Sequence, residues 1–84
     1  MGNVRIILTR FLEPTNTRPS RVRAEVLAPG YKPATIPYDH AWGFEKNNRA
    51  AAEEVMRQNR AARIVGERPA GEDKRGLYWI ASEA

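Results

Sequence analysis

The chain has 84 residues, of which 42% are hydrophobic and 29% charged, so it can build one small globular domain, residues 1–84, with a thin core. It holds no cysteine, which excludes disulfide bonds, thiolate metal sites and a cysteine nucleophile. The formal net charge is +4, and the excess of basic residues lies in residues 1–32, so the composition permits an anionic partner without requiring one.

The longest apolar run, residues 6–8, is far shorter than a membrane span. The amino terminus also lacks the apolar segment of a signal peptide. We therefore expect a soluble protein of the cytoplasm.

Three short strands are predicted in the first half of the chain. Residues 4–11, VRIILTRF, are rich in β-branched and apolar side chains. By the two-residue period, one face of this strand is lined by Val4, Ile6 and Leu8, and the opposite face is mixed, as in a sheet covered fully on one side and partly on the other.

The next two strands flank loops that contain proline. Residues 13–20 hold two prolines and predict a loop, and residues 21–28, RVRAEVLA, alternate apolar and charged side chains and predict a second, antiparallel strand. Residues 34–39, ATIPYD, predict a third strand, which Pro37 confines to an edge or a strand end.

One helix is predicted over residues 45–60, which contain no proline or glycine. Its side chains at i, i+3 and i+4 spacing would face the sheet. They are Ala51, Ala52, Val55, Met56 and Asn59. On its outer side, Glu45 with Arg49 and Glu53 with Arg57 have the spacing of i, i+4 ion pairs.

Residues 62–67 and 76–82 predict a final hairpin, separated by a polar, glycine-containing loop. The element order along the chain is β-β-β-α-β-β. It predicts an α+β fold, a single-domain two-layer sandwich in which one helix packs on one face of an antiparallel sheet.

The first candidate site is the basic second strand with the loop before it. Arg21 and Arg23 share one side of the strand, and guanidinium, hydroxyl and amide groups together can bind phosphate oxygens. The candidate nucleic-acid-binding residues are Thr15, Asn16, Arg18, Arg21, Arg23 and Lys32. Alternatively, this is a solvated sheet face whose arginines pair with Glu25 and Glu13.

The second candidate is the adjacent pair Asp39 and His40. Neighbours in a strand point to opposite faces, so the pair is poorly placed for acid–base catalysis, and Asp39 is expected to cap a turn. His40 is the only histidine, so we expect no metal site. The sequence has no glycine-rich phosphate loop, no GxSxG motif and no paired carboxylates in a defined setting, so we expect no cofactor and no enzymatic activity.

The aromatic residues form the third candidate. Tyr78 and Trp79 are neighbours in a predicted strand, so only one can face the helix, and the outward one could anchor a partner protein. The candidate partner-binding residues are Tyr38, His40 and Trp79. Packing in the thin core is the alternative for the aromatic rings, and Tyr38 and His40 would add stacking surface for unpaired bases if they lie on the basic face.

Three segments in this order resemble a family of small uncharacterised proteins encoded by plasmids, prophages and integrating elements. They are LEPTNTRPSRVRAEV, IPYDHAW and NNRAAAEEVM, and the resemblance extends over roughly residues 9–56. Glu13 and Pro19 stand where glycine is usual, and Asn48 stands where histidine is usual. The family implies no established reaction, but it implies an accessory protein of a mobile genetic element. The final hairpin lies outside the resemblance.

These observations predict a non-enzymatic phage, prophage or plasmid accessory protein that binds nucleic acid through its basic strand and loop, in the cytoplasm of a bacterial host. The alternative is an inhibitor of a host defence or regulatory complex that acts by protein–protein contact. The sequence leaves open whether the protein is a monomer or a dimer.

Overall fold

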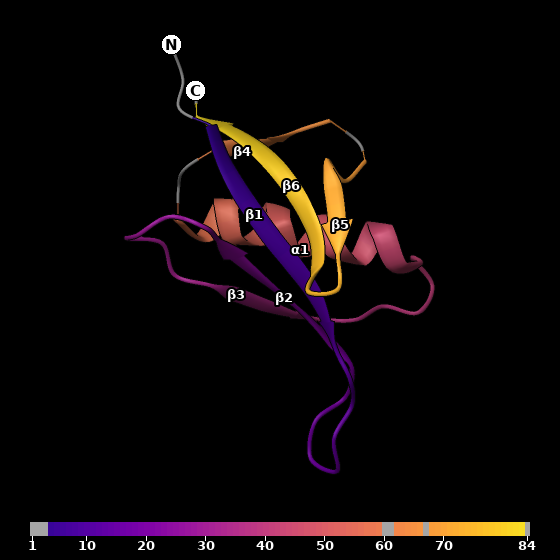
Figure 1. Cartoon of the computed structure of the whole chain (residues 1–84). Coiled ribbons are helices and arrows are strands. Elements are labelled where there is room, and N and C mark those ends of the chain that lie inside the picture. The colour runs from indigo at the N-terminus through magenta and orange to yellow at the C-terminus, as the bar shows by residue number, and fades with distance from the viewer. Residues whose placement is uncertain (1–3, 60–61, 67, 84) are drawn as a thin grey trace.

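The structure is a computed structural model that describes residues 4–59, 62–66 and 68–83, and it shows one helix lying across one face of an antiparallel sheet (Figure 1). The elements are β1 (Val4–Leu12), β2 (Arg21–Val26), β3 (Ala34–Pro37), α1 (Phe44–Asn59), β4 (Ala62–Val65), β5 (Gly71–Asp73) and β6 (Gly76–Glu83). The predicted α+β fold with a single helix on an antiparallel sheet is confirmed.

The strand order in the sheet is β3-β2-β1-β6-β4, and β5 also pairs with β6. Since β4 pairs with residues 80–83 and β5 with residues 76–78, the two short strands follow one another along β6. The sequence predicted a loop where β5 lies. Its Gly-Glu-Asp sequence has low strand propensity, so the strand is stabilised by its pairing with β6 and not by local preference.

A glycine is required where β6 begins beside β1. Gly76 has φ +153°, and an added Cβ would lie 2.1 Å from the carbonyl oxygen of Thr9. Any side chain at this position would therefore push the β5–β6 turn away from β1.

The strand register decides which side chains meet the helix. Ile7 lies opposite Val26 of β2 on one side and opposite Trp79 of β6 on the other, so the three side chains share one face. This face packs against α1, and we call it the helix face. The face of Val4, Ile6 and Leu8 points away from α1 and is the open face. The helix thus covers the mixed side of β1.

Trp79 is the largest fully buried side chain and is 1% exposed. Its indole Nε1 donates a hydrogen bond of 2.8 Å to Oγ1 of Thr9, which is itself buried. The indole therefore fills the core with its one polar group satisfied. Around it pack the small and β-branched residues Ile7, Val22, Ala24, Ala51, Ala52, Val55 and Ala81.

Two asparagine side chains fasten the ends of α1 to the chain on either side of β3. Asn47 accepts a hydrogen bond from the Asp39 backbone N–H (2.7 Å) and donates to the carbonyl oxygens of Asp39 (2.8 Å) and Gly43 (2.6 Å). At the other end, Asn59 accepts from the Lys32 N–H (3.0 Å) and donates to the Lys32 carbonyl oxygen (2.9 Å). The sheet-facing residues predicted for the helix are confirmed, because Ala51, Ala52, Val55 and Met56 are buried. Asn59 binds the β2–β3 loop through the Lys32 backbone.

The predicted ion pairs on the outer side of α1 were wrong in their partners. Arg49 bonds forward to Glu53 (2.8 Å), and Arg57 bonds back to Glu54 (2.6 Å). Because both basic side chains are taken by other acids, neither Glu45 with Arg49 nor Glu53 with Arg57 pairs. The hydrogen bonds from Arg57 lower the pKa of the Glu54 carboxyl.

Within the part of the chain that the structure describes, no helix combines the length and apolarity needed to cross a membrane.

Candidate nucleic-acid interface

Three arginines gather on the open face at the end of the sheet next to the β1–β2 loop. Arg10 of β1 lies directly opposite Arg23 of β2, and Arg21 lies opposite Leu12. Since residues two apart in a strand share a face, Arg21 and Arg23 are on the same side as Arg10. We call Arg10, Arg21 and Arg23 the arginine cluster.

The positive charge of this cluster is poorly compensated. Among the residues that the structure describes, the closest acid is Glu25, whose Oε2 lies 4.0 Å from Nη2 of Arg23. Arg21 donates to the backbone carbonyl of Pro19 (3.3 Å), and Arg10 is exposed and forms no ion pair with any described residue. Like charges directly opposite each other in a sheet are destabilising, so this arrangement favours binding of an anion.

The alternative expectation, arginines neutralised by Glu25 and Glu13, is met only in small part. Glu25 reaches Arg23 at the limit of an ion pair, and Glu13 forms no ion pair within the described residues. The guanidinium groups of Arg10 and Arg21 therefore stay available to a ligand.

The β1–β2 loop, residues 13–20, projects beyond the sheet and extends the basic end of the molecule (Figure 1). The Thr15 hydroxyl accepts the backbone N–H of Thr17 (3.4 Å) and of Arg18 (3.2 Å), and the Thr15 N–H bonds to the Arg18 carbonyl oxygen (2.8 Å). Thr15 thus fixes the turn, while Asn16 and Arg18 are exposed at its tip. Contact of these residues with nucleic acid stays a prediction.

Lys32 is separated from the other predicted phosphate-binding residues. It lies in the β2–β3 loop, beyond the end of β2 that is far from Arg21, and its backbone is bonded to Asn59 at the end of α1. The expectation that Lys32 belongs to the same site is therefore corrected. Arg21 begins β2, whereas Lys32 follows the opposite end of the same strand. The length of β2 therefore separates two residues that are close in sequence.

Asp39 and His40 do not form an acid–base pair. The Asp39 carboxylate accepts the Ala41 N–H (2.9 Å), and the Asp39 backbone is bonded to Asn47, so its expected role in capping a turn is confirmed. His40 is exposed and packs against Tyr38, with ring centroids 5.0 Å apart. The described residues contain no group of three or more His, Cys, Asp or Glu side chains that could hold a metal.

Tyr38 lies between two aromatic rings instead of standing free for a partner. Its ring is half-buried and meets Phe11 edge-on at 5.1 Å. Phe11 pairs with Val22 on the helix face, so Tyr38 and His40 lie on the side opposite the arginine cluster. They therefore do not add stacking surface to it.

Trp79 cannot serve as a partner anchor because it is buried in the core. That prediction is corrected, and its neighbour Tyr78 is the outward residue. The Tyr78 hydroxyl donates to Asp73 (2.7 Å) and accepts from Arg75 (2.5 Å). The hydrogen bond between Tyr78 and Asp73 lowers the pKa of the Asp73 carboxyl and raises the pKa of the Tyr78 hydroxyl.

Sequence reasoning missed Arg10 and the buried role of Asn47. The signal for Arg10 was present, because Arg10 follows Val4, Ile6 and Leu8 in the two-residue period, but only pairing with β2 shows that it meets Arg23. Asn47 gave no such signal, since an asparagine in a helix is usually exposed.

Comparison of the chain with protein-family models, with curated proteins and with solved structures gave no match.

Proposed function

We propose that this protein binds the phosphate backbone of a nucleic acid with the arginine cluster, and that it acts by binding and not by catalysis. The observation that carries the proposal is the direct cross-strand pairing of Arg10 with Arg23, next to Arg21. Three guanidinium groups on two adjacent strands can donate to successive phosphate oxygens. A bound phosphate chain would also remove the repulsion between the paired arginines.

The β1–β2 loop supports the same proposal from a second direction. Arg18 stands on a turn that Thr15 holds in place, three residues before Arg21. An ordered turn loses less conformational entropy on binding than a flexible one, so Arg18 can extend the phosphate path beyond the sheet. The resemblance of the PTNTR segment to proteins of plasmids and prophages supports a role in a mobile genetic element of a bacterium.

Fluorescence anisotropy with labelled single-stranded DNA, duplex DNA and RNA tests the proposal. We expect binding that weakens steeply between about 50 and 200 mM salt, since phosphate contacts release counterions. The Arg10→Ala/Arg23→Ala variant should lower affinity about tenfold or more, and for duplex DNA the salt slope should shrink by about 2 because two phosphate contacts are lost.

Lys32→Ala is the matched control, because it removes one exposed positive charge at the far end of β2. We expect it to lower affinity less than either single change, Arg10→Ala or Arg23→Ala. Equal losses for all three positions would show that net charge alone drives binding. No binding at low salt would overturn the proposal and favour the alternative, an inhibitor that contacts a host protein.

A further inference from the structure

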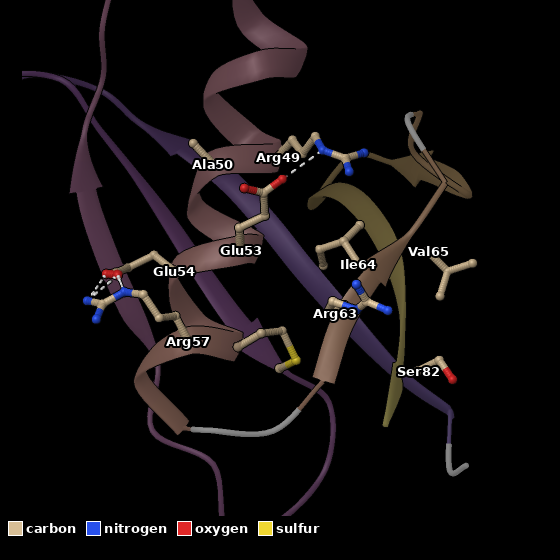
Figure 2. Close-up of a pocket in the computed structure, with 10 residues that line it drawn as sticks. Arg49, Ala50, Glu53, Glu54, Arg57, Arg63, Ile64, Val65 and Ser82 are labelled. Atoms are coloured by element: carbon tan, nitrogen blue, oxygen red, sulfur yellow. Dashed lines mark hydrogen bonds and ion pairs between the residues drawn. The ribbon is translucent and has the colours of Figure 1, made fainter. Parts of the chain in front are cut away.

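The free edge of β4 borders a cleft of about 970 Å³. Figure 2 shows this cleft between α1 and β4, with Arg49 and Glu53 on its helix side, whereas Arg57 turns away from β4 toward Glu54. In the described sheet β4 pairs with β6 alone, so its other edge presents main-chain N–H and C=O groups that a further strand could bind.

The cleft lies where a further strand would lie. Its lining includes Ile64, which shares the helix face with Ala81, and also Arg63 and Val65, which point to the open face. Residues from both faces of one strand can line one hollow only if the hollow spans the edge of the sheet. The side chains of an added strand would alternate between the two faces, so that some would contact Ile64 on the helix face and others Arg63 and Val65 on the open face.

The helix side of this position is partly apolar. Ala50 and Met56 of α1 line the cleft with Ile64 of β4. On the open face, Val65 is 54% exposed and lies opposite Ile80 of β6. A strand on the β4 edge would cover Val65 and the side of Ile64 that faces the cleft, which gives the position a hydrophobic component.

The two edges of the sheet, one formed by β3 and the other by β4 and β5, differ in their protection. Strand β3 ends at Pro37 and follows Pro33, and proline cannot donate to an added strand. No proline lies within β4, whose sequence is Ala-Arg-Ile-Val. Strand addition is therefore favoured at β4 over β3, and the cleft distinguishes β4 from β5, none of whose residues line it.

The charges at the cleft indicate what the added strand carries. Arg49 is paired with Glu53 and also donates to the Gly66 carbonyl oxygen, and Arg57 is paired with Glu54. Arg63 is exposed and has no ion pair with any described residue. An acidic side chain next to Arg63 would neutralise it, whereas a second copy of this chain would bring another Arg63 to the seam.

We propose that the free edge of β4 binds an extended segment of a partner protein as an additional strand, with an acidic side chain beside Arg63 and an apolar side chain toward Ile64 and Met56. This site is distinct from the arginine cluster, which lies on β1 and β2. Its test does not depend on nucleic-acid binding.

The probe is a display library of random nine-residue peptides, selected on the intact protein. We expect the enriched peptides to alternate apolar and acidic residues. When such a peptide is added, the outward-facing amides of β4 should exchange with solvent at least tenfold more slowly, because they gain main-chain hydrogen bonds. No enrichment, enrichment without this alternation, or unchanged exchange in β4 would each overturn the proposal.

Charge reversal at Arg63 sharpens the test. Selection on the Arg63→Glu variant should enrich peptides with lysine or arginine in place of the acid, and peptides from the first selection should bind it at least tenfold more weakly. Arg68→Glu is the matched control, because Arg68 is exposed and does not line the cleft. If both variants select the same acidic peptides, the assignment of Arg63 is wrong.

Discussion

The two faces of the sheet follow opposite rules. On the helix face, the largest buried side chain has its polar group paired, through the hydrogen bond from Trp79 to Thr9. On the open face, Arg10 and Arg23 lie opposite each other, and Glu25 reaches Arg23 only at the 4.0 Å limit of an ion pair. The helix face is arranged for stability, whereas the open face keeps a charge arrangement that stability alone does not favour. This difference is the basis of our proposal that the open face binds a ligand.

The largest expected effect is the loss of stability when the largest side chain of the helix face is removed. Trp79→Ala should lower the free energy of unfolding by about 3 to 5 kcal/mol, a large share of the roughly 4 to 12 kcal/mol expected for a domain of this size. Chemical denaturation monitored by circular dichroism measures this loss. Tyr78→Ala, one residue away on the open face, should cost only about 1 kcal/mol, and equal losses would mean that the two faces do not differ.

A smaller effect of opposite sign is expected on the open face. Arg10→Thr removes one of two opposed like charges and introduces a residue with higher strand propensity, so the free energy of unfolding should rise by up to about 0.5 kcal/mol at low salt. The gain should shrink in 1 M salt, which screens exposed charges. A clear loss of stability, measured by the same denaturation, would show that Arg10 has a structural role.

The smallest expected effect concerns the Tyr78 and Asp73 pair. The hydrogen bond from Tyr78 lowers the folded-state pKa of Asp73, so its contribution to stability is present above the unfolded pKa and is lost as pH falls through the lowered folded value. Tyr78→Phe should raise the pKa of Asp73 toward its ordinary range. A carboxyl NMR titration of both proteins measures the change, and an unchanged pKa would show that this hydrogen bond is not formed in solution.

The parts of the fold that local pattern decides were predictable. The helix has no internal proline or glycine, and its small sheet-facing residues follow the helical period, so its existence and inner face were predicted correctly. The strands β1, β2 and β6 carry β-branched and aromatic residues. Pairing between distant segments decided the rest, because β5 has a polar sequence and exists only as a partner of β6.

The candidate site was predicted in part. Arg21 and Arg23 share a face as expected, but the third member of the cluster, Arg10, comes from the neighbouring strand through the β1–β2 register. Lys32 was assigned to the site from its charge, although the hairpin carries it to the other end of the sheet. Trp79 was predicted to bind a partner, because the alternation of a strand shows only that Tyr78 and Trp79 face opposite sides. The register with Ile7 places Trp79 inside.

The two asparagines Asn47 and Asn59 tie the length of α1 to the length of the β3 segment beside it. Asn47 and Asn59 lie about 18 Å apart along the helix axis and bind the backbone on the two sides of β3. One residue inserted between them would turn Asn59 by about 100° and release one end of β3. We therefore expect insertions to be tolerated in the projecting β1–β2 loop and rejected in the middle of α1, so that variation in length within this fold concentrates beside the arginine cluster.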